Sequence, residues 1–244
     1  MTSSSVRMVG RSVVREEWGT AVIVGALYVL ATVAGVTAGV IGAPTQVAGM
    51  AERPGAVLAT ALLIAVMAVA VAGVGAMFQP LLSHDAHGRT GRGMALGFAA
   101  GRIAEGAIFL VAAAALVATL AVSEAMAGTT GAAEAAPYTA GGIALQAFYD
   151  YAVIAAQTAF CVSAALLYLL LFRSGRVPRW LSVWGLVATP MMLVAGLTLP
   201  FTNDPSSTVS SVLYAPMALQ EMVLAVWLIA FGLRPAVPAT TVAS

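Results

Sequence analysis

The stretch AAGRIAEGAIFLVAAAAL, residues 99–116, decides the fold class. It is apolar enough to form most of a membrane-spanning helix, which needs about 20 such residues. It also carries Arg102 and Glu105, three residues apart, although charged side chains within hydrocarbon are costly and rare. Such charges usually face the interior of a helical bundle, so the stretch predicts a buried polar site in a membrane protein.

The composition excludes a soluble globular domain. Hydrophobic residues make up 61% of the chain and charged residues 9%, whereas soluble domains carry about 25% charged residues. No basic stripe with interleaved aromatic residues is present, which excludes nucleic acid as a partner. All eleven basic residues are arginine, and Ala, Val and Gly are frequent. We therefore expect a bacterial plasma-membrane protein.

Hydropathy divides the chain into six candidate spans, which predicts an all-α, polytopic bundle of six transmembrane helices. The expected spans are roughly 20–42, 55–78, 94–122, 143–172, 179–200 and 212–233. The first is too long for a signal-peptide core, so we expect it to stay in the protein. The predicted organisation is an N-terminal tail (1–19), one transmembrane domain (20–234) and a disordered C-terminal tail (235–244).

The arginines fall almost entirely on one side of these spans. Nine lie in segments that six crossings place together: Arg7, Arg11, Arg15, Arg89, Arg92, Arg173, Arg176, Arg179 and Arg234. The other side has only Arg53. Basic loops stay in the cytoplasm, so both termini are predicted to be cytoplasmic. The tail's arginines recur every four residues, which suits an interfacial helix on the inner leaflet or a solvated tail that only sets topology.

Two glutamates are predicted at similar depth near the middle of the bilayer. With a rise of 1.5 Å per residue, Glu105 lies about 16 Å and Glu221 about 18 Å from the cytoplasmic surface. Glycines precede Glu105 at every fourth residue (Gly93, Gly97, Gly101), a spacing that lets helices pack closely and predicts that Glu105 points into the bundle. Arg102 can neutralise one glutamate. Burial favours the neutral form of the other, which could then donate a proton.

Other side chains are candidates for lining a substrate site. Asp150 lies toward the outer interface, and Gln220 directly precedes Glu221. Aromatic faces that could stabilise a cation are Phe98, Phe109, Trp184 and Trp227.

No cofactor or metal is expected. His84, Asp85 and His87 could supply metal ligands, but a solvated loop is the favoured interpretation. Nucleotide, zinc-protease and serine-hydrolase motifs are absent from the sequence. Cys161 is the single cysteine, so no intrachain disulfide can form, and we expect a small packing residue.

Four segments resemble the domain-of-unknown-function 4386 family: GALYVLATVAG (25–35), GRIAEGAIFL (101–110), LYLLLFRSGRVPRWLSVWGLVA (167–188) and ALQEMVLAVWLIAFG (218–232). The short RSGRVPRWL turn is the most specific, and the R-x-x-E of the third span and the late Glu221 also fit. The resemblance implies a six-helix bacterial membrane protein and no particular activity. The long acidic third loop, 123–139, departs from the family's usual pattern.

Three functional hypotheses follow. The first is an enzyme acting on a hydrophobic, lipid-borne substrate, in which Glu105 or Glu221 protonates an alkene or epoxide, as in small membrane-bound terpene cyclases. Arg102 would keep the other carboxylate charged. The second is a proton-coupled carrier of a small solute, and the third is a non-catalytic assembly partner in which the charges only specify helix packing. Membrane lipid is an expected partner, and the glycine row could also serve a homo-oligomer.

Overall fold

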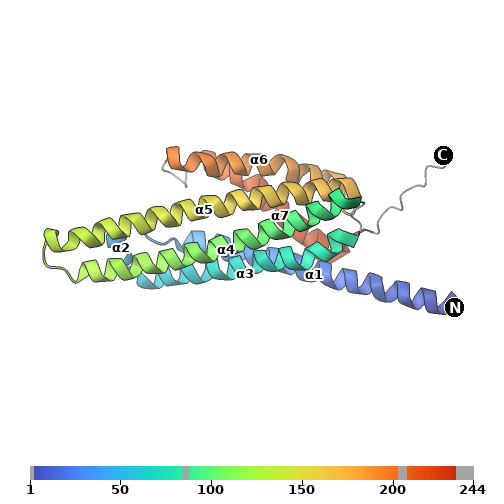
Figure 1. Ribbon diagram of the computed structural model, residues 1–244, viewed down its shortest axis with the longest axis horizontal. Coiled ribbons are helices and arrows are strands. Elements are labelled where there is room, and N and C mark those ends of the chain that lie inside the picture. The colour runs from blue at the N-terminus through green and yellow to red at the C-terminus, as the bar shows by residue number, and fades with distance from the viewer. Residues whose placement is uncertain (1–2, 85–87, 203–207, 235–244) are drawn as a thin grey trace. The chain divides into compact units, whose positions relative to one another are not determined.

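A computed structural model describes the backbone of residues 3–84, 88–202 and 208–234, and the side chains within 16–83, 89–198 and 212–234. Over these ranges the chain is helical and contains no strand. The helices, shown in Figure 1, are α1 (Ser3–Ile41), α2 (Val47–Met50), α3 (Pro54–His84), α4 (Gly88–Ala127), α5 (Ala132–Ser174), α6 (Arg179–Thr202) and α7 (Thr208–Phe231).

Every described helix except α2 is long and apolar enough to cross a membrane, which gives six candidate spans. They are Glu16–Ile41, Pro54–Ser83, Arg89–Ala127, Ala132–Ser174, Arg179–Thr198 and Val212–Phe231. The prediction of an all-α chain with six spans is confirmed. The chain is thus a multi-pass membrane protein by length and composition, and the side on which each terminus lies stays a prediction.

The third interhelical connection is much shorter than predicted. A loop over residues 123–139 was expected, but α4 continues to Ala127 and α5 begins at Ala132. The segment is rich in alanine, the best helix former, which extends both helices. Glu134 also stabilises the first turn of α5, because its carboxylate accepts hydrogen bonds from the N–H and hydroxyl of Thr130 at 3.0 and 3.3 Å.

The helices α4 and α5 are longer than the bilayer requires. They contain 40 and 43 residues, or about 60 and 65 Å, against a hydrocarbon core of about 30 Å. Both helices are therefore long enough to extend beyond the hydrocarbon, and Figure 1 shows the turn that joins them.

The chain divides into two compact units. Unit 1 contains residues 1–29, 73–101 and 161–244, and unit 2 contains residues 30–72 and 102–160. Each boundary falls inside a helix and not in a linker. At the N-terminus, α1 includes most of the predicted tail, and its position on the membrane stays a prediction. The predicted disordered tail, 235–244, lies outside the described residues.

The core of unit 2 is a cluster of small and aliphatic side chains from α1 to α4: Ala38, Met50, Val57, Ala61, Ile64, Ala113, Leu116 and Leu120. The short helix α2 is fastened to α4 by Ser123, whose hydroxyl accepts a hydrogen bond from the Ala51 N–H (2.9 Å) and donates one to the Val47 carbonyl (2.5 Å). Met50 of α2 is fully buried in the cluster.

Unit 1 is organised around the turn between α5 and α6. Gly175 ends α5 with a φ of +66°, a left-handed conformation that glycine adopts without strain. The chain then turns through Arg176 and Pro178 into α6. Arg176 is 2% exposed, and its guanidinium donates hydrogen bonds to the carbonyls of Leu81 (2.9 Å) and Arg234 (3.1 Å).

These contacts bring the arginine-bearing ends of several helices together. The same guanidinium forms an ion pair with Glu17 near the predicted start of the first span (2.9 Å). The N–H of Arg234, which follows α7, donates to the Arg176 carbonyl (2.9 Å). Within unit 1, the beginnings of the first and fifth spans and the ends of the second, fourth and sixth thus lie at one end, as the distribution of arginines predicts. We refer to it as the arginine-rich end.

Candidate functional site

The candidate site lies on α4, within unit 2. Arg102 and Glu105 are 2% and 4% exposed, and Arg102 Nη1 lies 3.0 Å from Glu105 Oε2. Residues three apart are neighbours on a helix surface, so the helix itself places the two groups in contact. The prediction that Glu105 points into the protein is confirmed. The guanidinium and the carboxylate form a desolvated ion pair in the middle of a candidate span.

Phe160 on α5 lies beside Arg102. The guanidinium carbon lies 5.0 Å from the centre of the Phe160 ring, within cation–π distance, and the ring is itself buried. Sequence reasoning missed this residue, since no fixed spacing links an aromatic residue of one span to an arginine of another.

Next to the pair, two helix backbones pack closely at Gly106. A Cβ atom at Gly106 would lie 2.5 Å from the backbone oxygen of Ala68 on α3. At Gly93, in contrast, nothing lies within 4 Å of such an atom, and at Gly97 the neighbour is the flexible end of Leu166. The backbones of α3 and α4 therefore approach each other one residue after Glu105.

The other predicted acid, Glu221, is partly buried on α7 and belongs to unit 1. Its pairing with Arg102, which lies in unit 2, stays a prediction. The adjacent Gln220 is fully buried, and both ends of its amide join helices. Its oxygen accepts a hydrogen bond from the Tyr168 hydroxyl, and its nitrogen donates to the Leu181 carbonyl at 3.2 Å.

The remaining predicted lining residues are dispersed. Phe109 is partly buried and packs against the core cluster of unit 2. Trp184 lies 6.3 Å from Trp180, and Trp227 lies 4.6 Å from Phe231, measured between ring centres.

The guanidinium of Arg234 covers the Trp227 ring at 5.4 Å, which places this tryptophan close to the arginine-rich end. Phe98 is buried and meets Phe78 edge to face at 6.0 Å. Trp184, Trp227 and Phe98 belong to unit 1, so a place for them beside Glu105 stays a prediction.

Asp150 is exposed on α5 and accepts a hydrogen bond from the Gln146 amide nitrogen at 3.1 Å. Its part in substrate binding stays a prediction.

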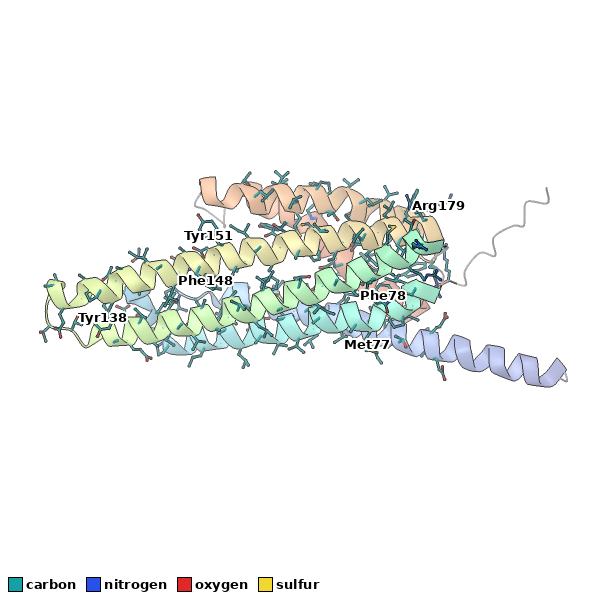
Figure 2. All side chains as sticks on the ribbon, in the orientation of Figure 1. Met77, Phe78, Tyr138, Phe148, Tyr151 and Arg179 are labelled. Atoms are coloured by element: carbon teal, nitrogen blue, oxygen red, sulfur yellow. The ribbon has the colours of Figure 1, made fainter. Side chains whose placement is uncertain are left out.

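An apolar groove of about 430 Å³ lies between the middle of α4 and residues 148–152 of α5. It is lined by Ala107, Ile108, Val111, Phe148, Tyr151 and Ala152. Phe148 and Tyr151 project from α5 in Figure 2. Ile108 follows Glu105 by three residues, so the wall of the groove contains a direct helical neighbour of the carboxylate.

For metal binding, no group of three or more suitable side chains occurs among the residues that the structure describes. His84, Asp85 and His87, for which a solvated loop is the favoured interpretation, lie outside the described side chains.

The comparisons with known proteins define a family and no activity. No curated protein and no solved structure matches the chain. A family described as Domain of unknown function (DUF4386) matches residues 23–232, which include all six candidate spans except the first seven residues of the first. The chain therefore belongs to the DUF4386 family.

Proposed function

We propose that the protein is a membrane-embedded enzyme that carries out acid–base chemistry on a hydrophobic, lipid-borne substrate. The observation that carries the proposal is the buried Arg102–Glu105 pair. Both groups are buried within a candidate membrane span, where interhelical polar contacts contribute little, so helix packing alone is a weak reason for their presence. Buried ionisable groups within membrane spans are more often functional.

The contact with Arg102 supports a different proposed role for each carboxylate. Beside a guanidinium that stays protonated, Glu105 is stabilised as a carboxylate and can accept a proton. Of the two glutamates predicted at this depth, Glu221 is then the proposed proton donor. In a protonation-initiated isomerisation or cyclisation, the donor's proton forms a C–H bond at an alkene carbon. The base removes a proton from a neighbouring carbon, so the reaction has no net redox change.

The groove between α4 and α5 supports a hydrophobic substrate. Its volume of about 430 Å³ lies within the range of about 300–1,000 Å³ that small-molecule sites occupy. Its lining is apolar apart from the Tyr151 hydroxyl. A chain lying there would be separated from Glu105 by a single turn of α4. Prenyl and terpenoid chains combine such apolar length with protonatable double bonds, and they are the proposed substrate class.

The test compares single variants in lipid nanodiscs. Wild-type protein, Glu105→Gln and Glu221→Gln are incubated with linear prenyl and terpenoid lipids, and products of unchanged mass and altered retention are sought by chromatography and mass spectrometry. We expect a loss of product of at least about 100-fold in both variants, since general acid–base catalysis contributes about 10²–10⁴-fold.

Glu124→Gln is the matched control, because Glu124 lies exposed on the same helix. This variant should keep the wild-type rate. Full activity of both site variants contradicts the proposal. Proton-coupled solute uptake into proteoliposomes that requires Glu105, without any lipid product, would establish the carrier hypothesis instead.

A further inference from the structure

Three polar side chains form a row along one face of α5. Gln146, Asp150 and Gln157 are separated by four and seven residues, a spacing that places them on the same side of a helix. The residues around them are mostly apolar. Ala155, two residues before Gln157, is exposed on nearly the opposite side. The helix therefore has a lipid-like face and a polar face at the same depth.

The polar face runs from the surface into the protein. Asp150 is exposed, Gln146 is partly buried and Gln157 is 7% exposed. Counting from Arg173 near the arginine-rich end, Asp150 lies about 35 Å and Gln157 about 24 Å along the helix axis. With a hydrocarbon core of about 30 Å, Asp150 is at the far boundary of the hydrocarbon and Gln157 lies within it.

One polar atom on this face lacks a partner. The Gln146 amide nitrogen donates to Asp150. The amide oxygen is buried and accepts no hydrogen bond from the described residues. Buried acceptors are normally satisfied, and ordered water is the usual partner where no protein group is in reach. The geometry therefore favours water beside Gln146, next to an exposed carboxylate.

The inner end of the row lies next to a residue that contacts Arg102. Phe160, whose ring covers the Arg102 guanidinium at 5.0 Å, follows Gln157 by three residues and is its neighbour on the helix surface. These residues all belong to unit 2.

We propose that this face of α5 is a hydrated path that conducts water and protons between the arginine-poor side of the membrane and the Arg102–Glu105 pair. Amides suit such a path, because each can donate and accept hydrogen bonds and none titrates. At the mouth, Asp150 supplies a group that can take up or release a proton.

The path deepens the proposed function, and its purpose rests on that function. A base that takes a proton from a substrate has to lose it before the next turnover. In that step the O–H bond of the Glu105 carboxyl group breaks, one proton passes to water, and no electron is transferred. A path that opens to a single side of the membrane allows this proton exchange and does not conduct protons across the membrane.

The test is the accessibility of introduced cysteines to a charged methanethiosulfonate. This reagent reacts with thiolates, which form in water and not against lipid. Cys161 is first replaced by alanine, since it follows Gln157 by four residues on the same face. Gln157→Cys is then compared with Ala155→Cys, the matched control on the other face, which lies only about 3 Å away along the helix axis. The reagent is added to either side of sealed vesicles, and labelling is quantified by mass spectrometry.

We expect Gln157→Cys to react at least roughly tenfold faster than Ala155→Cys, and from the arginine-poor side only. Equal rates, or reaction from the arginine-rich side, overturn the proposal. If Gln157→Cys does not fold, Cys161 of the natural chain serves as the target. Its modification from the arginine-poor side should be at least threefold slower in Asp150→Trp, since a large ring would obstruct the mouth. An unreactive Cys161, or the same rate in both proteins, also overturns the path.

Labelling does not depend on turnover. A failed labelling experiment therefore leaves the proposed function intact, and an inactive protein leaves the path intact.

Discussion

Replacement of Arg176 by methionine should lower the thermal stability of the protein by a large and measurable amount. The Arg176 guanidinium is buried between segments that are far apart in the sequence. It donates to the carbonyls of Leu81 and Arg234 and forms an ion pair with Glu17. Methionine keeps much of the aliphatic length and removes all three hydrogen bonds.

The loss of stability is determined by the groups that lose their hydrogen-bond partner when Arg176 is replaced. The buried carbonyl of Leu81 and the part-buried carbonyl of Arg234 lose a charged donor, and an unsatisfied buried group costs about 1–3 kcal/mol. The Glu17 carboxylate loses its counter-ion, but its side chain is 34% exposed, so water compensates much of that loss. The total agrees with the cost of about 3–5 kcal/mol for removing one partner of a buried ion pair. For a chain of this length, this corresponds to a fall of about 6–20 °C in Tm.

The assay is thermal unfolding in detergent, followed by the loss of monodisperse protein in size-exclusion chromatography. Arg179→Met is the matched control, because Arg179 lies three residues away in the same turn and is exposed. Figure 2 labels it at the start of α6. Both variants remove one positive charge from the same loop, so effects on membrane insertion cancel. If the two variants melt within 2 °C of each other, a stabilising role of the Arg176 contacts is refuted.

Two further substitutions test the packing of unit 2. Gly106→Ala should lower the free energy of unfolding by about 1–3 kcal/mol, because the new Cβ would meet a backbone oxygen at 2.5 Å. At Gly93 a new Cβ would meet nothing, so Gly93→Ala should be neutral or slightly stabilising. Both effects are measured as changes in Tm. Ser123→Ala should release α2 and speed hydrogen exchange over residues 47–51, since both of its bonds to that segment are lost. Thr158→Ala, whose hydroxyl bonds back to its own helix, should leave that exchange unchanged. Equal hydrogen exchange over residues 47–51 in both variants would show that Ser123 does not hold α2 in place.

The sequence was sufficient for the six spans, because in hydrocarbon a chain must satisfy its backbone within each segment, and hydropathy then determines the helices almost alone. It was insufficient between residues 123 and 139. There the small side chains looked like loop residues, although alanine also favours a helix that continues into water. The short helix α2 was not predicted, since four residues give no periodicity.

The candidate site was predictable in part for a related reason. A spacing of three residues suffices to place Arg102 beside Glu105, so depth and helical geometry identified the pair. Contacts across helices depend on rotation and tilt, which hydropathy does not encode. For this reason Phe160 was missed, and Arg176 was interpreted only as a charge that sets topology.

The two buried arginines, Arg102 and Arg176, provide the most direct separation of function from architecture. Both are 2% exposed. The hydrogen bonds of Arg176 join segments distant in the sequence, whereas Arg102 forms an ion pair within its own helix and a cation–π contact with Phe160 of α5. If this difference reflects their roles, Arg102→Met should abolish the lipid product or the Glu105-dependent transport while lowering Tm by less than Arg176→Met does. Arg176→Met should retain activity at temperatures below its own Tm. The opposite order of Tm values, together with an active Arg102→Met, would mean that the α4 pair is architectural, and the assembly-partner hypothesis would then account for the intramembrane charges best.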